Sequence, residues 1–181
     1  MKVLILGGAK SGKSDFAQEI TLRLAGEGKR YYVATMIPAD KEDDARIQSH
    51  IERRAGMEFE TVEQGRNLME CLDRVDRNSA VLLDSVTSLL TNELFPKEKN
   101  YELDEEAACR MGKEVEQFLD SVDNAVVVAD NLFFDAVHYD RETDVFRRHL
   151  GSICCALAGR CDTVLEMTCG NLIIHKGELP Q

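Results

Sequence analysis

GGAKSGKS, residues 7–14, matches the pattern G-x-x-x-x-G-K-[ST] in full. It follows a continuous apolar run at residues 3–6 and precedes residues 14–26, whose apolar side chains recur at helical spacing. Glycine reaches backbone conformations closed to other residues, so successive N–H groups can turn inward around a phosphate. The start of the following helix adds its partial positive charge. The segment therefore predicts a phosphate-binding loop, made of Gly7, Gly8, Ala9, Lys10, Ser11, Gly12, Lys13 and Ser14.

Apolar runs and amphipathic stretches alternate along the rest of the chain. Strands are predicted at residues 3–6, 31–34, 59–62, 80–84, 125–129, 163–167 and 172–175. Helices are predicted at residues 14–26, 41–54, 68–75, 85–95, 103–122 and 141–159. We expect a loop at residues 96–101 and a hairpin around residues 169–171. This alternation predicts one α/β domain over residues 1–181, with a mostly parallel sheet and helices on both of its faces.

Composition restricts the chain to ordinary globular classes. With 181 residues, 44% of them hydrophobic, the chain can bury a core, which argues against a disordered protein. The formal charge of −11 repels phosphate backbones, so we expect neither a nucleic-acid partner nor binding to anionic membranes. No window approaches the roughly 20 apolar residues of a membrane span. A local basic site for a small anion remains compatible with this charge.

The first ten residues and the cysteines bear on the expected compartment. MKVLILGGAK carries a lysine and a short apolar run, as a signal peptide does, but the run stops at glycines and no small-residue cleavage site follows. The six cysteines contain no C-x-x-C and no metal-ligand spacing. We therefore expect reduced core thiols and a cytoplasmic protein.

The loop motif and the end of a later strand predict the chemistry of three side chains. Lys13 would reach the β- and γ-phosphates of a nucleoside triphosphate, and the Ser14 hydroxyl would bind Mg²⁺. Asp84 ends a buried apolar run, where phosphate-loop proteins place a carboxylate that holds Mg²⁺ through water. Asp84 could instead, or in addition, cap the helix that follows it.

A second basic site is suggested by residues 41–54. Arg46, His50 and Arg54 lie four residues apart on one face of the predicted helix, and Ile47 and Ile51 form the neighbouring stripe that would pack inward. Arginine grips phosphate bidentately, and a neutral histidine beside it can act as a nucleophile. The alternative is a solvated helix face. In that case the arginines would pair with Asp43, Asp44 and Glu52.

Four segments together carry a family resemblance: LILGGAKSGKS, YYVATM, ARIQSHIERR and VLLDSVTSLLTNELF. The chain resembles the bifunctional adenosylcobinamide kinase / adenosylcobinamide-phosphate guanylyltransferase family of cobalamin assembly. R-I-x-x-H after a V-A-T strand end, followed by D-x-x-T-x-x-x-x-N, is far more specific than the phosphate loop. The similarity is clear over about the first 95 residues and is looser after that.

The resemblance implies two reactions and a fold. A nucleoside triphosphate, ATP or GTP, phosphorylates the aminopropanol hydroxyl of adenosylcobinamide. GTP then guanylylates a histidine, and the GMP moves onto adenosylcobinamide phosphate. The histidine of R-I-x-x-H corresponds to His50, and Arg46 and Arg54 would steady phosphates. Thr35 and the segment from Asp84 to Thr87 would line the nucleotide cleft. The implied fold is a RecA-like phosphate-loop NTPase, and the implied assembly is a homo-oligomer, a trimer.

The second half of the chain departs from the family pattern. Where the family shows N-E-V-G, this chain has residues 130–133, DNLF, so Asn131 replaces a glutamate. The later G-R-x-N-Q reads GSICC at residues 151–155, and cysteines cannot supply the amide hydrogen bonds. Arg147 and Arg148 keep part of the basic character of that helix. Two alternatives therefore stay open: a kinase of another small molecule, or a nucleotide-binding protein that has lost one or both activities.

Overall fold

A seven-stranded sheet organises the computed structural model, which describes residues 1–180 apart from the side chain of Arg46. The strand order is β3-β2-β4-β5-β1-β6-β7. Every neighbouring pair is parallel except β6 and β7, which form an antiparallel hairpin. The strands are β1 (Lys2–Gly7), β2 (Arg30–Ala34), β3 (Glu60–Glu63), β4 (Ala80–Asp84), β5 (Asn124–Asp130), β6 (Thr163–Thr168) and β7 (Asn171–Lys176).

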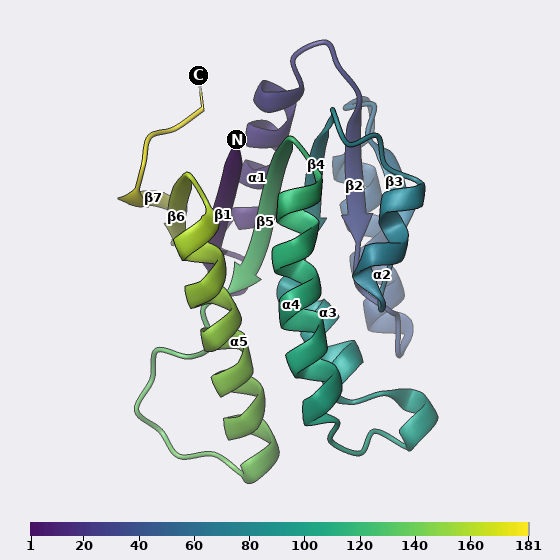
Figure 1. The fold of residues 1–181 in the computed structure, drawn as a ribbon, viewed down its shortest axis with the longest axis vertical. Coiled ribbons are helices and arrows are strands. Elements are labelled where there is room, and N and C mark those ends of the chain that lie inside the picture. Colours follow the sequence, from purple (N-terminus) through teal and green to yellow (C-terminus); the bar gives the residue numbers. More distant parts are fainter. Residues whose placement is uncertain (181) are drawn as a thin grey trace.

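Five α-helices and two short 3₁₀ helices connect the strands in the described part of the chain (Figure 1). They are α1 (Lys13–Ala25), α2 (Lys41–Arg53), η1 (Leu68–Asp73), α3 (Val86–Leu94), η2 (Lys97–Lys99), α4 (Glu105–Ser121) and α5 (Arg141–Arg160). None of these helices has the length and apolar composition needed to cross a membrane. The alternation predicted from the sequence is confirmed, with boundaries that differ by one or two residues.

Two of the connecting segments form 3₁₀ helices. A helix is predicted at residues 68–75, and the structure has the 3₁₀ helix η1, which ends at Asp73 and buries Leu68, Cys71 and Leu72. A 3₁₀ helix stacks residues i and i+3, which suits a segment of six residues that presents one narrow face to the core. The expected loop at residues 96–101 contains the single turn η2.

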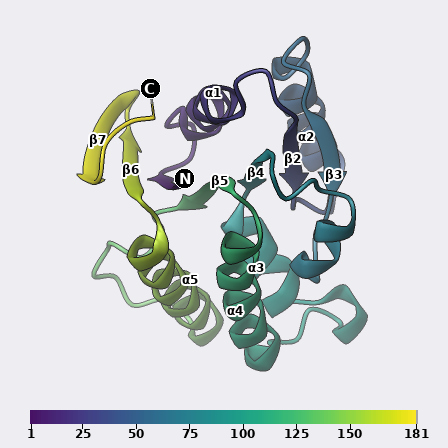
Figure 2. The same ribbon diagram turned by 45° about the horizontal axis from the view of Figure 1, so that its top comes forward.

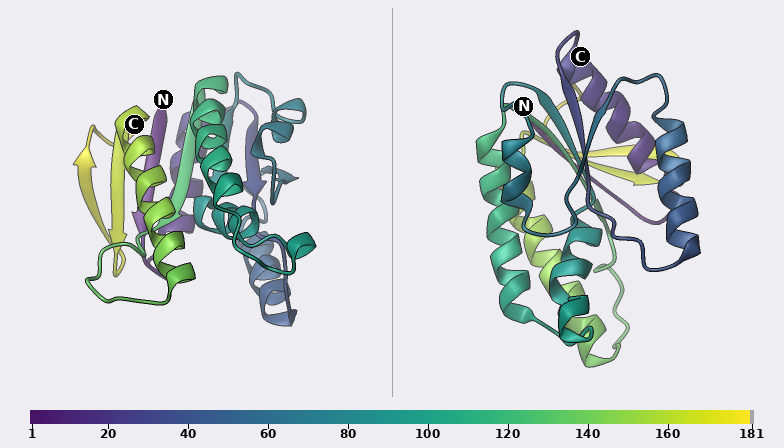
Figure 3. Two further views of the ribbon diagram at one scale, coloured as in Figure 1. Left: turned by 60° about the horizontal axis from the view of Figure 1, so that its bottom comes forward. Right: turned by 90° about the vertical axis from the view of Figure 1, so that its right-hand side faces the viewer.

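Helices cover both faces of the sheet, as Figures 2 and 3 show. α3, α4, α5 and η1 pack on one face over the larger core, which contains Phe118, Leu83 and Val127. α1 and α2 lie on the other face, and α1 packs there through Ala17 and Ile20. The central strands are buried on both sides, which explains why their sequences read as unbroken apolar runs.

Helix α2 is oriented differently from the prediction. Ile51 was expected to pack inward, but it is 47% exposed, whereas Arg54, directly after the helix, is 8% exposed. The prediction is wrong because the Arg54 guanidinium finds an inward partner, the ring of Tyr32, with 3.7 Å between Cζ and the ring centroid. The Asp40 carboxylate caps the start of the helix by accepting from two backbone N–H groups.

The cysteines only partly match the prediction of core thiols. All six are free, but only three of them are buried. The buried thiols are Cys71, Cys154 and Cys161, and the exposed ones are Cys109, Cys155 and Cys169.

Candidate active site

The phosphate loop joins the end of β1 to the start of α1 at the carboxyl edge of the sheet. Gly12 has φ +91°, a left-handed conformation that favours glycine, and it precedes the first residue of α1. A Cβ at Gly7 would lie 2.6 Å from Ser11 Oγ and 2.7 Å from the carbonyl oxygen of Met167. The loop therefore needs glycine at both positions. Ser11 Oγ is buried inside the loop, and none of the described residues offers it a hydrogen bond.

Lys13 is held in place by two acceptors. Its ammonium donates to the carbonyl of Gly8 at 3.1 Å and pairs with Asp130 Oδ1 at 2.7 Å. Asp130 ends β5, next to β1, and its backbone N–H donates to Thr87 Oγ1 at 2.8 Å. Because both side chains are largely shielded from water, solvent and salt weaken the attraction between their charges less than in an exposed ion pair.

Asp84 ends β4 and accepts a hydrogen bond from the Tyr32 hydroxyl at 2.8 Å. Burial, and then the neighbouring Asp84 carboxylate, raise the pKa of Tyr32, so its proton stays on the hydroxyl. The capping role considered for Asp84 belongs to its neighbour: Ser85 Oγ accepts from the N–H of Ser88 at the start of α3. Asp84 is thus left for another role at the carboxyl edge.

The donor chemistry of this edge fits Mg²⁺. The half-buried Ser14 hydroxyl lies in the first turn of α1, and the Asp84 carboxylate follows a parallel strand of the same sheet. Hydroxyl and carboxylate oxygens are hard ligands of the kind Mg²⁺ takes, together with water and substrate phosphates.

Two contacts anchor the end of α2 to this site. Arg53 pairs with Asp15 in the first turn of α1 at 3.5 Å. Arg54 stacks on Tyr32, which in turn donates to Asp84.

His50 lies one turn before Arg54, and its carbonyl accepts from the N–H of Arg54 at 3.3 Å. Its ring atom Nδ1 is buried without a partner among the described residues, an exception to the usual pairing of buried polar atoms. The side chain of Arg46 lies outside the described part of the structure.

The D-x-x-T-x-x-x-x-N segment ties neighbouring strand ends together. Besides Asp84, it supplies Thr87, whose hydroxyl accepts from the backbone N–H of Asp130. It also supplies Asn92, whose side-chain amide donates to the carbonyls of Thr35 and Gly65, both at 2.8 Å. Thr35 itself is fully buried, and its hydroxyl both donates to and accepts from the backbone of Ser85. In this structure Thr35 therefore ties the end of β2 to the end of β4.

The family of this chain follows from sequence comparison. The sequence model of the family described as "Cobinamide kinase / cobinamide phosphate guanyltransferase" matches residues 3–174, nearly the whole chain. The chain belongs to this family. A bifunctional adenosylcobalamin biosynthesis protein CobU from Escherichia coli is 35% identical over 115 residues, which cover 59% of this chain and 61% of the relative. CobU from Salmonella typhimurium is 38% identical over 98 residues, covering 52% of this chain and 51% of the relative.

These alignments span between half and two thirds of the length of the CobU relatives. Among solved structures, an ATPase domain superposes with a TM-score of 0.53 at 10% identity, covering 97% of this chain and 76% of that domain. Identity at that level bears on the fold alone. The fold is that of a RecA-like phosphate-loop NTPase, as the family resemblance implied.

Asn131, which stands where the family pattern N-E-V-G has its glutamate, lies beside the phosphate loop. The backbone N–H of Asn131 donates to the carbonyl of Gly7, and its side-chain amide donates to Glu166 Oε1 at 3.1 Å. Glu166 on β6 also contacts His175 Nε2 at 2.9 Å. The hydrogen bond from His175, followed by that from Asn131, lowers the pKa of Glu166. A carboxylate is thus present here, but β6 supplies it.

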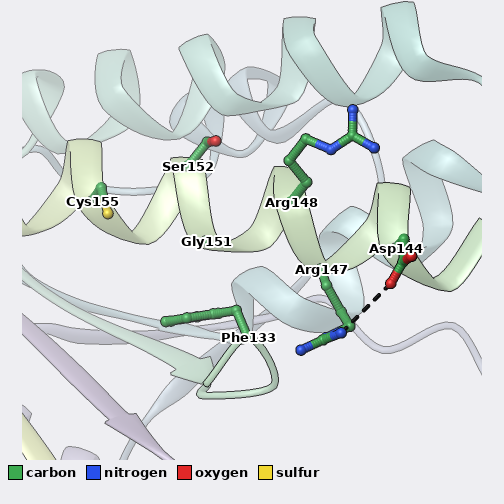
Figure 4. A pocket seen from close by; sticks show the side chains of 7 residues that line it. All are labelled: Phe133, Asp144, Arg147, Arg148, Gly151, Ser152 and Cys155. Carbon is green, nitrogen blue, oxygen red and sulfur yellow. Dashed lines mark ion pairs between the residues drawn. The ribbon is translucent and has the colours of Figure 1, made fainter. Parts of the chain in front are cut away.

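A hollow of about 800 Å³ lies along α5, where the chain has GSICC in place of the family's G-R-x-N-Q (Figure 4). Phe133 lies beneath Gly151, while Arg147 turns toward Asp144. Arg147 also pairs with the Asp135 carboxylate at 2.6 Å and donates to three backbone carbonyls, those of Leu132, Asp135 and Val137, which fixes the loop at residues 131–140. The complete lining is Phe133, Asp144, Arg147, Arg148, Gly151, Ser152 and Cys155.

Sequence reasoning missed three groups at the site: Tyr32, Asp130 and Glu166. Asp130 had an available signal, since it ends an apolar run as Asp84 does, and the carboxyl ends of parallel strands share one edge. Tyr32 and Glu166 had none, because their roles depend on partners that lie 52 and 35 residues away along the chain.

Proposed function

We propose that this family member phosphorylates adenosylcobinamide and then transfers GMP to the product through a guanylylated His50. The observation that carries the proposal is the position of His50 on a helix that contacts both the phosphate-loop helix and Tyr32 at its end. Membership of the family supports the same pair of reactions. The CobU relatives, described as bifunctional, support it too.

In the kinase step, the acceptor hydroxyl oxygen attacks the γ-phosphorus of ATP or GTP. A new P–O bond forms, the hydroxyl proton passes to water, the bond to the β-phosphate oxygen breaks, and the nucleoside diphosphate leaves. Lys13 and the N–H groups of residues 7–14 stabilise the charge that develops on the transferring group. Asp130, 2.7 Å from Lys13 Nζ, competes with the phosphates of the nucleotide for this lysine.

In the guanylylation step, His50 attacks the α-phosphorus of GTP through the ring nitrogen other than the buried Nδ1. A P–N bond forms and pyrophosphate leaves. The phosphate oxygen of adenosylcobinamide phosphate then attacks the same phosphorus, and the electron pair of the P–N bond returns to the imidazole. Dividing the transfer in two lets one site hold a triphosphate and a bulky acceptor in turn.

Mg²⁺ belongs to this proposal: the Ser14 hydroxyl would bind it directly, Asp84 would hold it through water, and the ion would neutralise phosphate charge during the transfer. The corrinoid acceptor is bulky, and the open hollow along α5 offers room beside the loop that starts at Asn131. A cytoplasmic homo-oligomer, a trimer, completes the proposal. Light scattering on the purified protein measures its assembly.

The experiment that tests the guanylylated histidine uses the purified protein with Mg²⁺ and GTP, followed by intact-mass and peptide analysis. We expect a GMP adduct on the peptide that contains His50. His50→Ala should abolish the adduct, while His149→Ala, which removes a histidine on α5, should keep it. Lys13→Ala should remove the adduct and phosphate transfer from ATP to adenosylcobinamide together.

The same assay separates the alternatives. Phosphate transfer to adenosylcobinamide without an adduct would reduce the function to that of a kinase. Transfer only to another alcohol would change the substrate. Tight nucleotide binding without any turnover, even with the corrinoid present, would indicate a nucleotide-binding protein that has lost both activities.

A further inference from the structure

Tyr32 lies between two groups of the active site without being one of the expected nucleotide contacts. It is 4% exposed, and its hydroxyl donates to Asp84 Oδ2 at 2.8 Å. The guanidinium of Arg54 covers its ring at 3.7 Å, and Phe59 meets it edge-on with 6.2 Å between ring centroids. The side chain is therefore fixed by packing around its ring, which directs its hydroxyl toward Asp84.

The neighbouring tyrosine shows that this placement is specific. Tyr31 is also buried, but successive side chains of a strand point to opposite faces, and Tyr31 packs in the other core. Of the two, Tyr32 is the one on the face that carries α1 and α2. Its hydroxyl reaches across from β2 to the end of the adjacent strand β4.

Arg54 has an unusual environment for a charged side chain. It is 8% exposed, and its described contacts are the Tyr32 ring and a 3.4 Å hydrogen bond to Thr61 Oγ1. Burying a guanidinium is costly unless its contacts compensate, and a tyrosine ring supplies a cation–π contact. Since its backbone N–H bonds to the carbonyl of His50, Arg54 also connects the histidine helix to the ring.

We propose that Tyr32 is a positioning residue that orients the Asp84 carboxylate for Mg²⁺, and that Arg54 holds the Tyr32 ring for this purpose. The inference rests on the proposed function only in assuming that Mg²⁺ accompanies the nucleotide at Ser14 and Asp84. Groups that hydrogen-bond a metal-binding carboxylate fix its rotation, and their loss commonly lowers metal affinity about tenfold or more. The connection through Arg54 places the metal carboxylate and the end of the His50 helix relative to each other.

The test is the equilibrium binding of a non-hydrolysable GTP analogue, measured by calorimetry over a range of Mg²⁺ concentrations. Tyr32→Phe keeps the ring and removes only the hydroxyl. We expect it to raise the Mg²⁺ concentration at half-saturation about tenfold and to leave binding without Mg²⁺ unchanged. Tyr31→Phe, the matched control on the opposite face, should behave as the unsubstituted protein.

A second variant tests the part played by Arg54. Arg54→Lys keeps the charge but loses the planar stack, and we expect an increase of about two- to fivefold in the Mg²⁺ half-saturation concentration. In the Tyr32→Phe background, the same substitution should add nothing, because its effect would pass through the lost hydroxyl. An additive effect would overturn the role given to Arg54.

The outcomes separate this inference from the proposed function. Equal Mg²⁺ dependence in Tyr32→Phe and Tyr31→Phe would overturn the inference. It would also be overturned if Tyr32→Phe lost the same fraction of its nucleotide affinity with and without Mg²⁺, because that loss would come from packing alone. A shifted Mg²⁺ dependence without a GMP adduct on His50 would sustain the role of Tyr32 and refute the guanylyltransferase. No nucleotide binding by the unsubstituted protein would overturn both.

Discussion

Asp130→Asn should strengthen nucleotide binding, although it removes one of the two partners of the phosphate-loop lysine. The carboxylate lies 2.7 Å from Lys13 Nζ, at the position from which this lysine must turn toward the phosphates. Asparagine keeps the shape and can still accept a hydrogen bond from Lys13, but it lacks the negative charge. The substitution therefore removes a competitor of the nucleotide while preserving the local packing.

The size of the effect follows from Coulomb's law. If Lys13 binds both groups at hydrogen-bond distance, the carboxylate and a phosphate oxygen lie at most about 5.5 Å apart. Their repulsion is then about 3 kcal/mol at an effective dielectric constant of 20 and about 0.75 kcal/mol at that of water. An intermediate value of about 1.5 kcal/mol corresponds to a Kd about tenfold lower.

Calorimetric titration with Mg²⁺ and a non-hydrolysable GTP analogue measures this change. Asp73→Asn, on the exposed surface at the end of η1, changes the net charge by the same amount and should leave the Kd nearly unchanged. The gain in Asp130→Asn should shrink at high salt, because screening weakens the repulsion. Unchanged or weaker binding in Asp130→Asn would refute the reasoning and would make Asp130 a supporting partner of Lys13.

Three further predictions concern stability and thiol reactivity. Gly7→Ala should lower the free energy of unfolding, measured by thermal unfolding, by about 1–3 kcal/mol, because its Cβ would enter occupied space. Gly8→Ala should lower it much less, because its Cβ would come no closer than 3.7 Å to a neighbouring side chain. Asn92→Ala leaves two carbonyls without their donor and should cost about 2–3 kcal/mol in urea unfolding; a cost near zero would mean that water replaces the amide. Iodoacetamide at about pH 8 should modify the three exposed cysteines first, because burial raises the pKa of the other three thiols and leaves little reactive thiolate; equal labelling of all six would contradict the burial. The raised pKa values are about 11 for Cys71, about 12 for Cys154 and about 11 for Cys161.

Local patterns in the sequence were sufficient for the fold and for half of the site. The phosphate loop is a continuous segment whose glycines, lysine and serine act through their own backbone and first helical turn, so the motif alone predicts its structure. Asp84 was predictable because it ends an unbroken apolar run, and such runs become central strands. The type of helix at residues 68–75 was less predictable. In so short a stretch, an α-helix and a 3₁₀ helix bury apolar residues at nearly the same positions.

The direction in which α2 faces could not be predicted from its own residues. Its periodicity favoured burying Ile47 and Ile51, yet the helix leaves Ile51 exposed and Arg54, directly after it, turns inward. The reason lies in Tyr32, whose ring offers the guanidinium a stack that no pattern within residues 41–54 could reveal. Tertiary contacts here override the amphipathic signal.

By itself the sequence determined the order of strands and helices along the chain, the phosphate loop and the histidine that the family resemblance singles out. Only the tertiary structure decided which polar groups meet, namely Lys13 with Asp130 and Tyr32 with Asp84. The physical reason is that these partners belong to different parallel strands and their loops, which the crossover helices bring to one edge of the sheet. Hydrogen bonds and ion pairs act over a few ångströms, so the sheet order, not distance along the chain, selects their partners.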